Sequence, residues 1–123
     1  MNTRIYLFCI LLVLVVPCIS ESEQVFEKTG LASWYGPGHH GNTTASGEKF
    51  NMKDYSAAHK TLKFGTRVKV VNVDNGRAVV VTINDRGPYV KGRIIDLSKS
   101  AAAQLGCMRK GICRVILVIV EDI

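Results

Sequence analysis

Alternating and continuous apolar runs divide the chain into short segments that favour β-structure. Polar and apolar residues alternate across Thr66–Val73, which predicts a half-buried strand. The apolar run Ala78–Ile83 follows, and we expect this strand to be buried on both faces. Between the two runs, Asn75-Gly76 favours a type I′ turn, because both residue types tolerate positive φ. The pattern therefore predicts a β-hairpin.

The remaining segments complete a small, mainly β domain. Strands are expected at Leu31–Tyr35, Ala57–His59, Arg93–Leu97 and Val115–Val120, the last of them central in its sheet. Ser98 can cap a helix that Gly106 ends, and the polar segment 39–49 is expected to be a surface loop. An open sheet would expose the apolar strand 115–120 at an edge, which proteins avoid. We therefore predict a closed six-stranded β-barrel with one or two short helices.

The first twenty residues have the pattern of a signal peptide. Arg4 precedes the apolar run Ile5–Val16, which is too short to span a bilayer comfortably. Pro17 ends the run, and we expect cleavage after Ser20. Lipidation of Cys18 is ranked second, because a small residue normally precedes a lipidated cysteine and here the preceding residue is Pro17. An uncleaved membrane anchor is the third alternative. The protein is thus expected to be exported to the periplasm, the cell envelope or the exterior, with outer-membrane association as the lipidated alternative.

The domain that remains after cleavage is small and basic. Residues 21–29 are expected to form a flexible arm, and residues 30–123 one domain. Cleavage removes only Arg4 among the charged residues, so the net charge falls from +6 to +5. Such a domain is attracted to anionic cell-wall polymers, although scattered basic residues could serve solubility alone. Nucleic acid is excluded by the compartment and by the lack of a binding motif. We expect a monomer with no membrane span once the signal peptide is removed.

Two cysteines, Cys107 and Cys113, lie outside the predicted signal peptide and flank five residues. In an oxidising compartment we expect them to form a disulfide that contributes to stability. Zinc would need two more ligands, and the histidines are far away in sequence. We therefore expect no metal and no cofactor.

The segment Asn84–Pro88 brings a carboxylate to the end of the second hairpin strand. Gly87 and Pro88 must end that strand, because proline has no N–H for the ladder. Asp85 is thereby placed beside Arg86 on a rigid scaffold, where reactive side chains are often presented. The structural alternative is an Asp85–Arg86 ion pair that only fixes the turn.

Five motifs, in order, resemble those of the rare lipoprotein A (RlpA) family of lytic transglycosylases. They are Ala32–Gly36, Thr44–Glu48, Ala57–Leu62, Asn84–Pro88 and Arg93–Ser98. The resemblance extends from about Gly30 to Val120 and implies a double-psi β-barrel. Expansins and barwin-like domains share this barrel and bind or loosen polysaccharide, so the fold alone does not determine the activity.

The resemblance implies a reaction on the glycan strands of peptidoglycan, preferentially strands stripped of their peptides. The bond between N-acetylmuramic acid and N-acetylglucosamine is broken by the muramic C6 hydroxyl, which leaves a 1,6-anhydro end. This reaction needs an acid and a base, and one carboxyl can act as both in turn. Many family members carry a second, C-terminal domain that binds stripped glycan, and we expect none after Ile123.

The resemblance also implies the residues of the site. Asp85 is expected to be the catalytic acid and base, with Glu48 raising its pKa or stabilising positive charge on the sugar. His59 is expected to orient a carboxyl or contact sugar, with a structural histidine as the alternative. We expect Arg86 to point away from Asp85 or to bind a substrate carboxylate.

Four further residues are candidates for substrate binding. Tyr35 could stack on a sugar or belong to the core, and His40 and Thr44 lie in the surface loop. Asp96 is expected to stabilise the turn before Ser98, with substrate contact as the alternative. Two other functions stay open, an expansin-like binding module and a glycoside hydrolase with two suitably spaced carboxyls.

Overall fold

The computed structural model describes residues 27–121, so the expected signal peptide lies outside the described residues. Strands and helices follow one another in the order β1 (Glu27–Trp34), η3 (Pro37–His39), β2 (Ser56–Ala58), β3 (Arg67–Asn72), β4 (Ala78–Asp85), β5 (Arg93–Leu97), α2 (Lys99–Leu105) and β6 (Ile112–Glu121). The short η3 is a 3₁₀ helix. Within the described residues, no helix is long and apolar enough to cross a membrane.

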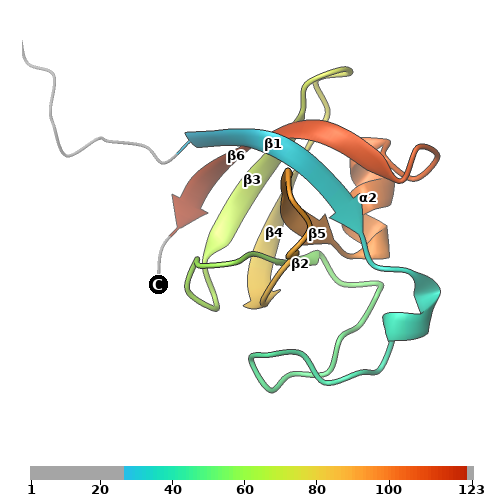
Figure 1. Ribbon diagram of the computed structural model, residues 1–123, viewed down its shortest axis with the longest axis vertical. Helices are drawn as coiled ribbons and strands as arrows, with labels where there is room; N and C mark the ends of the chain where they lie inside the picture. The colour runs from blue at the N-terminus through green and yellow to red at the C-terminus, as the bar shows by residue number, and fades with distance from the viewer. Residues whose placement is uncertain (1–26, 122–123) are drawn as a thin grey trace, which may run out of the picture.

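The six strands form a closed barrel in the order β1-β5-β2-β4-β3-β6 (Figure 1). β1 runs parallel to β5 and β2 runs parallel to β4, whereas the other neighbouring pairs are antiparallel. Every strand therefore has two partners, which confirms the predicted closed barrel. β6 is enclosed by β1 and β3, so its apolar residues form no exposed edge.

β1 begins earlier than the sequence indicated. Its first residues pair with β6, starting at Glu27 opposite Val118, so the expected arm of residues 21–29 extends too far by three residues. The side chains of residues 27–29 are exposed, and this polar pattern concealed the strand. A Cβ on Gly30 would lie 2.7 Å from Cγ2 of Ile94, so a glycine lets β1 and β5 approach each other.

The β3–β4 hairpin differs from the prediction in two respects. Burial alternates along β4, with Val79, Val81 and Ile83 inside and their neighbours half-buried, because a barrel strand presents only one face to the interior. Burial on both faces was thus a wrong prediction. The turn is also not type I′: Gly76 has φ +76°, but no residue other than glycine has positive φ among those described. Instead, the Gly76 N–H donates to the carbonyl of Asn72 across a longer loop.

The core has two parts. The main cluster fills the barrel and includes Ala101, Ala102 and Leu105, the buried face of α2. As predicted, the Ser98 hydroxyl caps α2 by accepting from the Ala101 N–H, and Gly106 ends the helix with φ +77°. A small second cluster joins Tyr35, Phe50 and Ala58, with Met52 packed against it. This second cluster anchors the long connection between β1 and β2, which lies beyond one end of the barrel (Figure 1).

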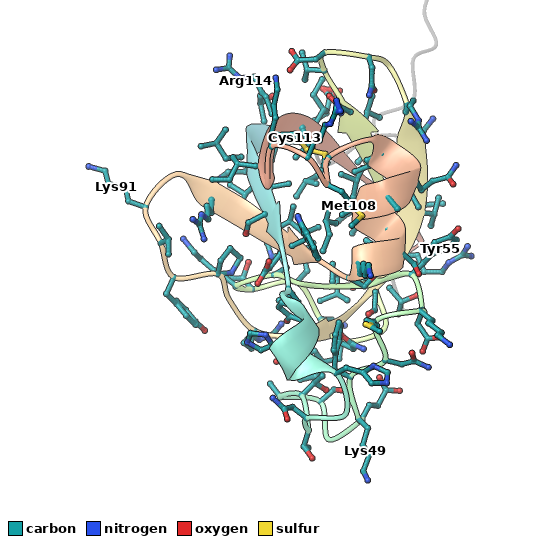
Figure 2. The ribbon with its side chains drawn as sticks, turned by 90° about the vertical axis from the view of Figure 1, so that its right-hand side faces the viewer. Lys49, Tyr55, Lys91, Met108, Cys113 and Arg114 are labelled. Carbon is teal, nitrogen blue, oxygen red and sulfur yellow. A yellow bond between two sulfur atoms is a disulfide. The ribbon has the colours of Figure 1, made fainter. Side chains whose placement is uncertain are left out.

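The predicted disulfide between Cys107 and Cys113 is confirmed, with the two Cα atoms 5.9 Å apart. Figure 2 shows Cys113 beside α2, at the opposite end of the molecule from Lys49 in the β1–β2 connection. Both half-cystines are buried and belong to the main cluster. The bond therefore closes the segment between α2 and β6 far from that connection.

We predict that replacing both cysteines with alanine lowers the free energy of unfolding by about 2–3 kcal/mol, because the denatured chain gains the entropy of an open loop. Urea denaturation of the oxidised protein and the double variant measures this difference. Reduced wild-type protein is the matched control and should resemble the variant. Equal midpoints for the oxidised protein and the variant would contradict the prediction.

Candidate active site

Asp85 is the last residue of β4, as the sequence predicted. Its backbone pairs with Ala58 of β2, and its carbonyl oxygen accepts from the His59 N–H at 3.1 Å. The strand ends there because Gly87 has φ +117° and Pro88 has no N–H to donate. The side chain of Asp85 is half-buried. Pairing with β2 thus fixes the backbone that carries this carboxyl.

The carboxyl of Asp85 receives three hydrogen bonds from the part of the chain that the structure describes. The Tyr35 hydroxyl donates to Oδ2 at 2.6 Å, and the N–H groups of Ala45 and Arg86 donate to Oδ1 at 2.8 and 2.9 Å. These donors come from the residue directly after β1, from the β1–β2 connection and from the turn after β4. All three treat Asp85 as an acceptor, which suits a carboxylate.

The Arg86 guanidinium points away from this carboxyl, in accordance with one of the two expectations. It donates to the carbonyl oxygens of His59 and Leu62 and lies 4.0 Å from the ring centroid of Phe64. A side-chain ion pair with Asp85 is therefore not what holds the turn. Arg86 instead fixes the segment after β2.

Tyr35 directly follows β1 and is held on two sides by other rings. It stacks on His39 with centroids 5.2 Å apart and meets Phe50 edge-on at 4.6 Å. Burial raises the pKa of the Tyr35 phenol far above its usual value, and the hydrogen bond and charge of Asp85 and the charge of Asp96 add to this. The phenol therefore stays protonated and remains a donor to Asp85. Sequence reasoning missed this contact, because the two residues are 50 positions apart.

Asp96 lies close to Asp85 through the strand register. Ala58 pairs with Asp85 on one side and with Asp96 on the other, and Asp96 pairs with Ser33 of β1. The Ser33 hydroxyl donates to Oδ1 of Asp96 at 3.0 Å. The expectation that Asp96 stabilises the turn before Ser98 was wrong, because the carboxyl is bonded across to β1.

The electrostatic surroundings of Asp96 have opposing effects. Burial raises the pKa of the Asp96 carboxyl above its ordinary value, and the charge of Asp85 adds to the rise. The Ser33 hydrogen bond and the charges of His39 and Arg93 oppose it, but burial outweighs them.

The loop residues Thr44 and Glu48 are brought together by a tight turn. The Thr44 hydroxyl and N–H both donate to the Glu48 carbonyl, at 2.8 and 2.7 Å, and this turn presents the Ala45 N–H to Asp85. The Glu48 side chain is exposed and lines a depression of about 270 Å³ with Phe64 and Asn84, among others. Within the described residues, its carboxyl makes no hydrogen bond to Asp85. The structure therefore does not join the two carboxyls directly.

Two histidines act as acceptors for backbone N–H groups. His59 is buried, and its Nδ1 accepts from the N–H groups of Thr61 and Leu62, each at 3.1 Å. Burial lowers the pKa of His59, and the nearby cations, Arg86 first, lower it further. His40 accepts from the Met52 N–H through Nδ1 at 3.2 Å. Both rings thus organise backbone turns. Within residues 27–121, no group of three or more His, Cys, Asp or Glu side chains could hold a metal ion.

A family model described as lytic transglycolase matches residues 27–117. The chain belongs to this family. The match, together with the closed six-stranded barrel, identifies the fold as the predicted double-psi β-barrel. The RlpA resemblance in the sequence is likewise confirmed by curated relatives.

Two of these relatives show how much is shared. The chain is 58% identical over 94 residues to the probable endolytic peptidoglycan transglycosylase RlpA of Synechocystis sp., an overlap covering 76% of this chain and 29% of that protein. It is 52% identical over 90 residues to the endolytic peptidoglycan transglycosylase RlpA of Helicobacter pylori, covering 73% and 29%. The chain thus spans less than a third of the length of these relatives.

Among solved structures, the apo expansin of Clavibacter michiganensis superposes with a TM-score of 0.63 at 25% identity. The superposition covers 80% of this chain and 52% of the expansin. An expansin therefore has the same barrel fold as this chain, so the activity must be argued from the residues of the site.

We predict that Asp96→Asn stabilises the fold increasingly as pH rises. Because the folded-state pKa of Asp96 is raised, the wild type loses stability as pH increases from about 3.8, the ordinary value, through the folded-state pKa. Asparagine has no charge to bury and can still accept from Ser33. Urea denaturation between pH 3 and pH 7 measures the gap between variant and wild type.

Asp74→Asn is the matched control, since it removes one carboxylate from the exposed hairpin loop. A stability gap for Asp96→Asn that stays constant or shrinks toward pH 7 would contradict the assigned direction of the Asp96 pKa.

Proposed function

We propose that this protein is an exported lytic transglycosylase that cleaves peptidoglycan glycan strands between N-acetylmuramic acid and N-acetylglucosamine. The observation that carries the proposal is the Asp85 carboxylate, fixed at the end of β4 by three hydrogen-bond donors within the region matched by the family. The names of the RlpA relatives support the substrate. The action outside the cytoplasmic membrane follows from that substrate and from the expected signal peptide.

The contacts of Asp85 suit a catalytic base. Its oxygens accept from Tyr35, Ala45 and Arg86, so the group is oriented as a carboxylate ready to receive a proton. The C6 hydroxyl of the muramic residue loses its proton to Asp85, and its oxygen forms a bond to the anomeric carbon of the same sugar. The glycosidic oxygen leaves with a proton from an acid. No water is consumed, so the product carries a 1,6-anhydro end.

The loop that supplies Ala45 can also bind the glycan. The depression lined by Glu48 includes Thr82, Ile83 and Asn84, which directly precede Asp85 along β4. A sugar chain that passes Asp85 can therefore extend over Glu48. In this position the Glu48 carboxylate would stabilise positive charge that develops on the ring.

The alternative function is an expansin-like module that binds wall polysaccharide without cutting it. The superposition with the Clavibacter expansin is the observation that favours it. Such a module would need a surface for the polysaccharide, such as the depression lined by Glu48, but it would not need the proton acceptor at Asp85.

We predict that the purified protein releases products with anhydro ends from peptidoglycan sacculi and from glycan stripped by an amidase. Mass spectrometry should find them lighter by one water than the corresponding reducing products. Asp85→Asn should lower the rate by about 10²–10⁴-fold, the usual range for a lost general base.

Matched binding measurements make the outcomes distinct. Co-sedimentation with sacculi should be similar for wild type and Asp85→Asn. Reducing ends would indicate a hydrolase instead. Tight binding without any product from the wild type would contradict the proposal and support the expansin-like module.

A further inference from the structure

We propose that Asp96 is a second catalytic residue, the general acid that protonates the leaving glycosidic oxygen while Asp85 acts as the base. The inference rests on the proposed transglycosylase function and extends it. Its basis is the register that places Ser33, Asp96, Ala58 and Asp85 in one row across β1, β5, β2 and β4.

This row separates the two carboxyls by a single strand. Neighbouring strands are about 4.8 Å apart, so the backbones of Asp85 and Asp96 lie roughly 9–10 Å apart, with Ala58 between them. Ala58 is 1% exposed and carries only a methyl group. The two acids can therefore reach toward a sugar from opposite sides of a small, buried residue.

Tyr35 shows that the two carboxyls share one environment. Its hydroxyl bonds to Asp85 at 2.6 Å, and the charges of both acids act on its phenol. The charge of Asp85 also acts on Asp96 itself. The register, the hydrogen bond and these interactions agree in placing both carboxyls at one site.

The surroundings of the two acids differ in the way that acid and base roles require. Within residues 27–121, Asp85 accepts three hydrogen bonds, whereas the Asp96 carboxyl accepts one, from Ser33. Burial raises the pKa of Asp96, and Asp85 adds to the rise. The charged groups that oppose it are His39 and Arg93. Two carboxyls in such different settings divide proton donation and proton acceptance.

The proton and electron pairs balance in this arrangement. The C6 hydroxyl gives its proton to Asp85, and its oxygen forms the new bond to the anomeric carbon. The bond from that carbon to the glycosidic oxygen breaks, and this oxygen takes the proton of Asp96. Asp85 ends protonated and Asp96 ionised, and exchange with solvent restores both.

Glu48 is less suited to the acid role. Its side chain is exposed and lies on a loop, whereas Asp96 is half-buried on a strand. A carboxylic acid that must donate near neutral pH needs an environment that disfavours its charge. In this assignment Glu48 stabilises positive charge on the sugar ring, and Asp96 protonates the leaving glycosidic oxygen.

The test compares two substrates with Asp96→Asn, Glu48→Gln and Asp85→Asn. Natural glycan needs a proton on its leaving oxygen, whereas an aryl β-glycoside of N-acetylmuramic acid releases a phenolate that does not. We expect Asp96→Asn to lower turnover of glycan by about 10²–10⁴-fold but turnover of the aryl glycoside by less than about tenfold. Asp85→Asn should lose both activities. Asp74→Asn, in the hairpin loop, is the charge-matched control and should resemble wild type.

The possible results separate this inference from the proposed function. If the wild type forms no anhydro product, both are overturned. If the wild type is active and Asp96→Asn cleaves glycan at a similar rate, the inference alone fails. It fails in the same way if Asp96→Asn lowers turnover of glycan and of the aryl glycoside by the same factor. It also fails if Glu48→Gln, and not Asp96→Asn, shows the selective loss on natural glycan.

A pH profile tests the same role in a variant that keeps the carboxyl. Ser33→Ala removes the hydrogen bond that stabilises ionised Asp96, so its pKa should rise further. Because a general acid must be protonated, the alkaline limb of kcat/KM on glycan should move up by about one pH unit. A lower rate with an unmoved limb would assign Asp96 a structural role and overturn the inference.

Discussion

The site depends on the pairing of β2 with two strands at once. β2 has only three residues, yet it bonds to β4 on one edge and to β5 on the other. Both strands carry an acid beside Ala58, so closing the barrel also sets the spacing of the two acids. Neither carboxyl could be displaced far without breaking a ladder that the closed barrel needs.

Around this pairing, segments far apart in the sequence each contribute a hydrogen-bonding group. Ser33 of β1 donates to Asp96, and Tyr35, directly after β1, donates to Asp85. The loop supplies the Ala45 N–H, and the segment after β2 is held by the Arg86 guanidinium. The side chains of the two aspartates are therefore held by hydrogen bonds from segments that are distant in the sequence.

Much of the architecture could be predicted from local patterns. β5, the Ser98 cap and the Gly106 stop depend on neighbouring residues and were predicted with nearly correct bounds. The early start of β1 was missed because residues 27–29 have exposed polar side chains, and their strand is defined by backbone pairing with β6. The turn type was missed because Asn75 uses its side-chain oxygen to bind the Arg77 N–H rather than adopting positive φ.

The site was predicted less completely than the fold. The motif around Asp85 led directly to one acid, because the strand and its end are local features. The relation between Asp85 and Asp96 depends on register across β2, which includes an irregularity between Ala57 and Ala58. Such a register shift cannot be derived from hydrophobic periodicity, since it changes which residues face one another without changing the pattern.

The small cluster of Tyr35, Phe50 and Ala58 has a consequence for motion. It is separate from the main core, and it holds the connection that delivers the Ala45 N–H to Asp85. Proteins open in cooperative units of different stability, and a loop anchored by few apolar contacts opens before a closed barrel. A partial opening of this kind would release one donor from the base while the ladder around Ala58 remained intact. The β1–β2 connection is therefore expected to open as a separate unit, without unfolding the barrel that carries both aspartates.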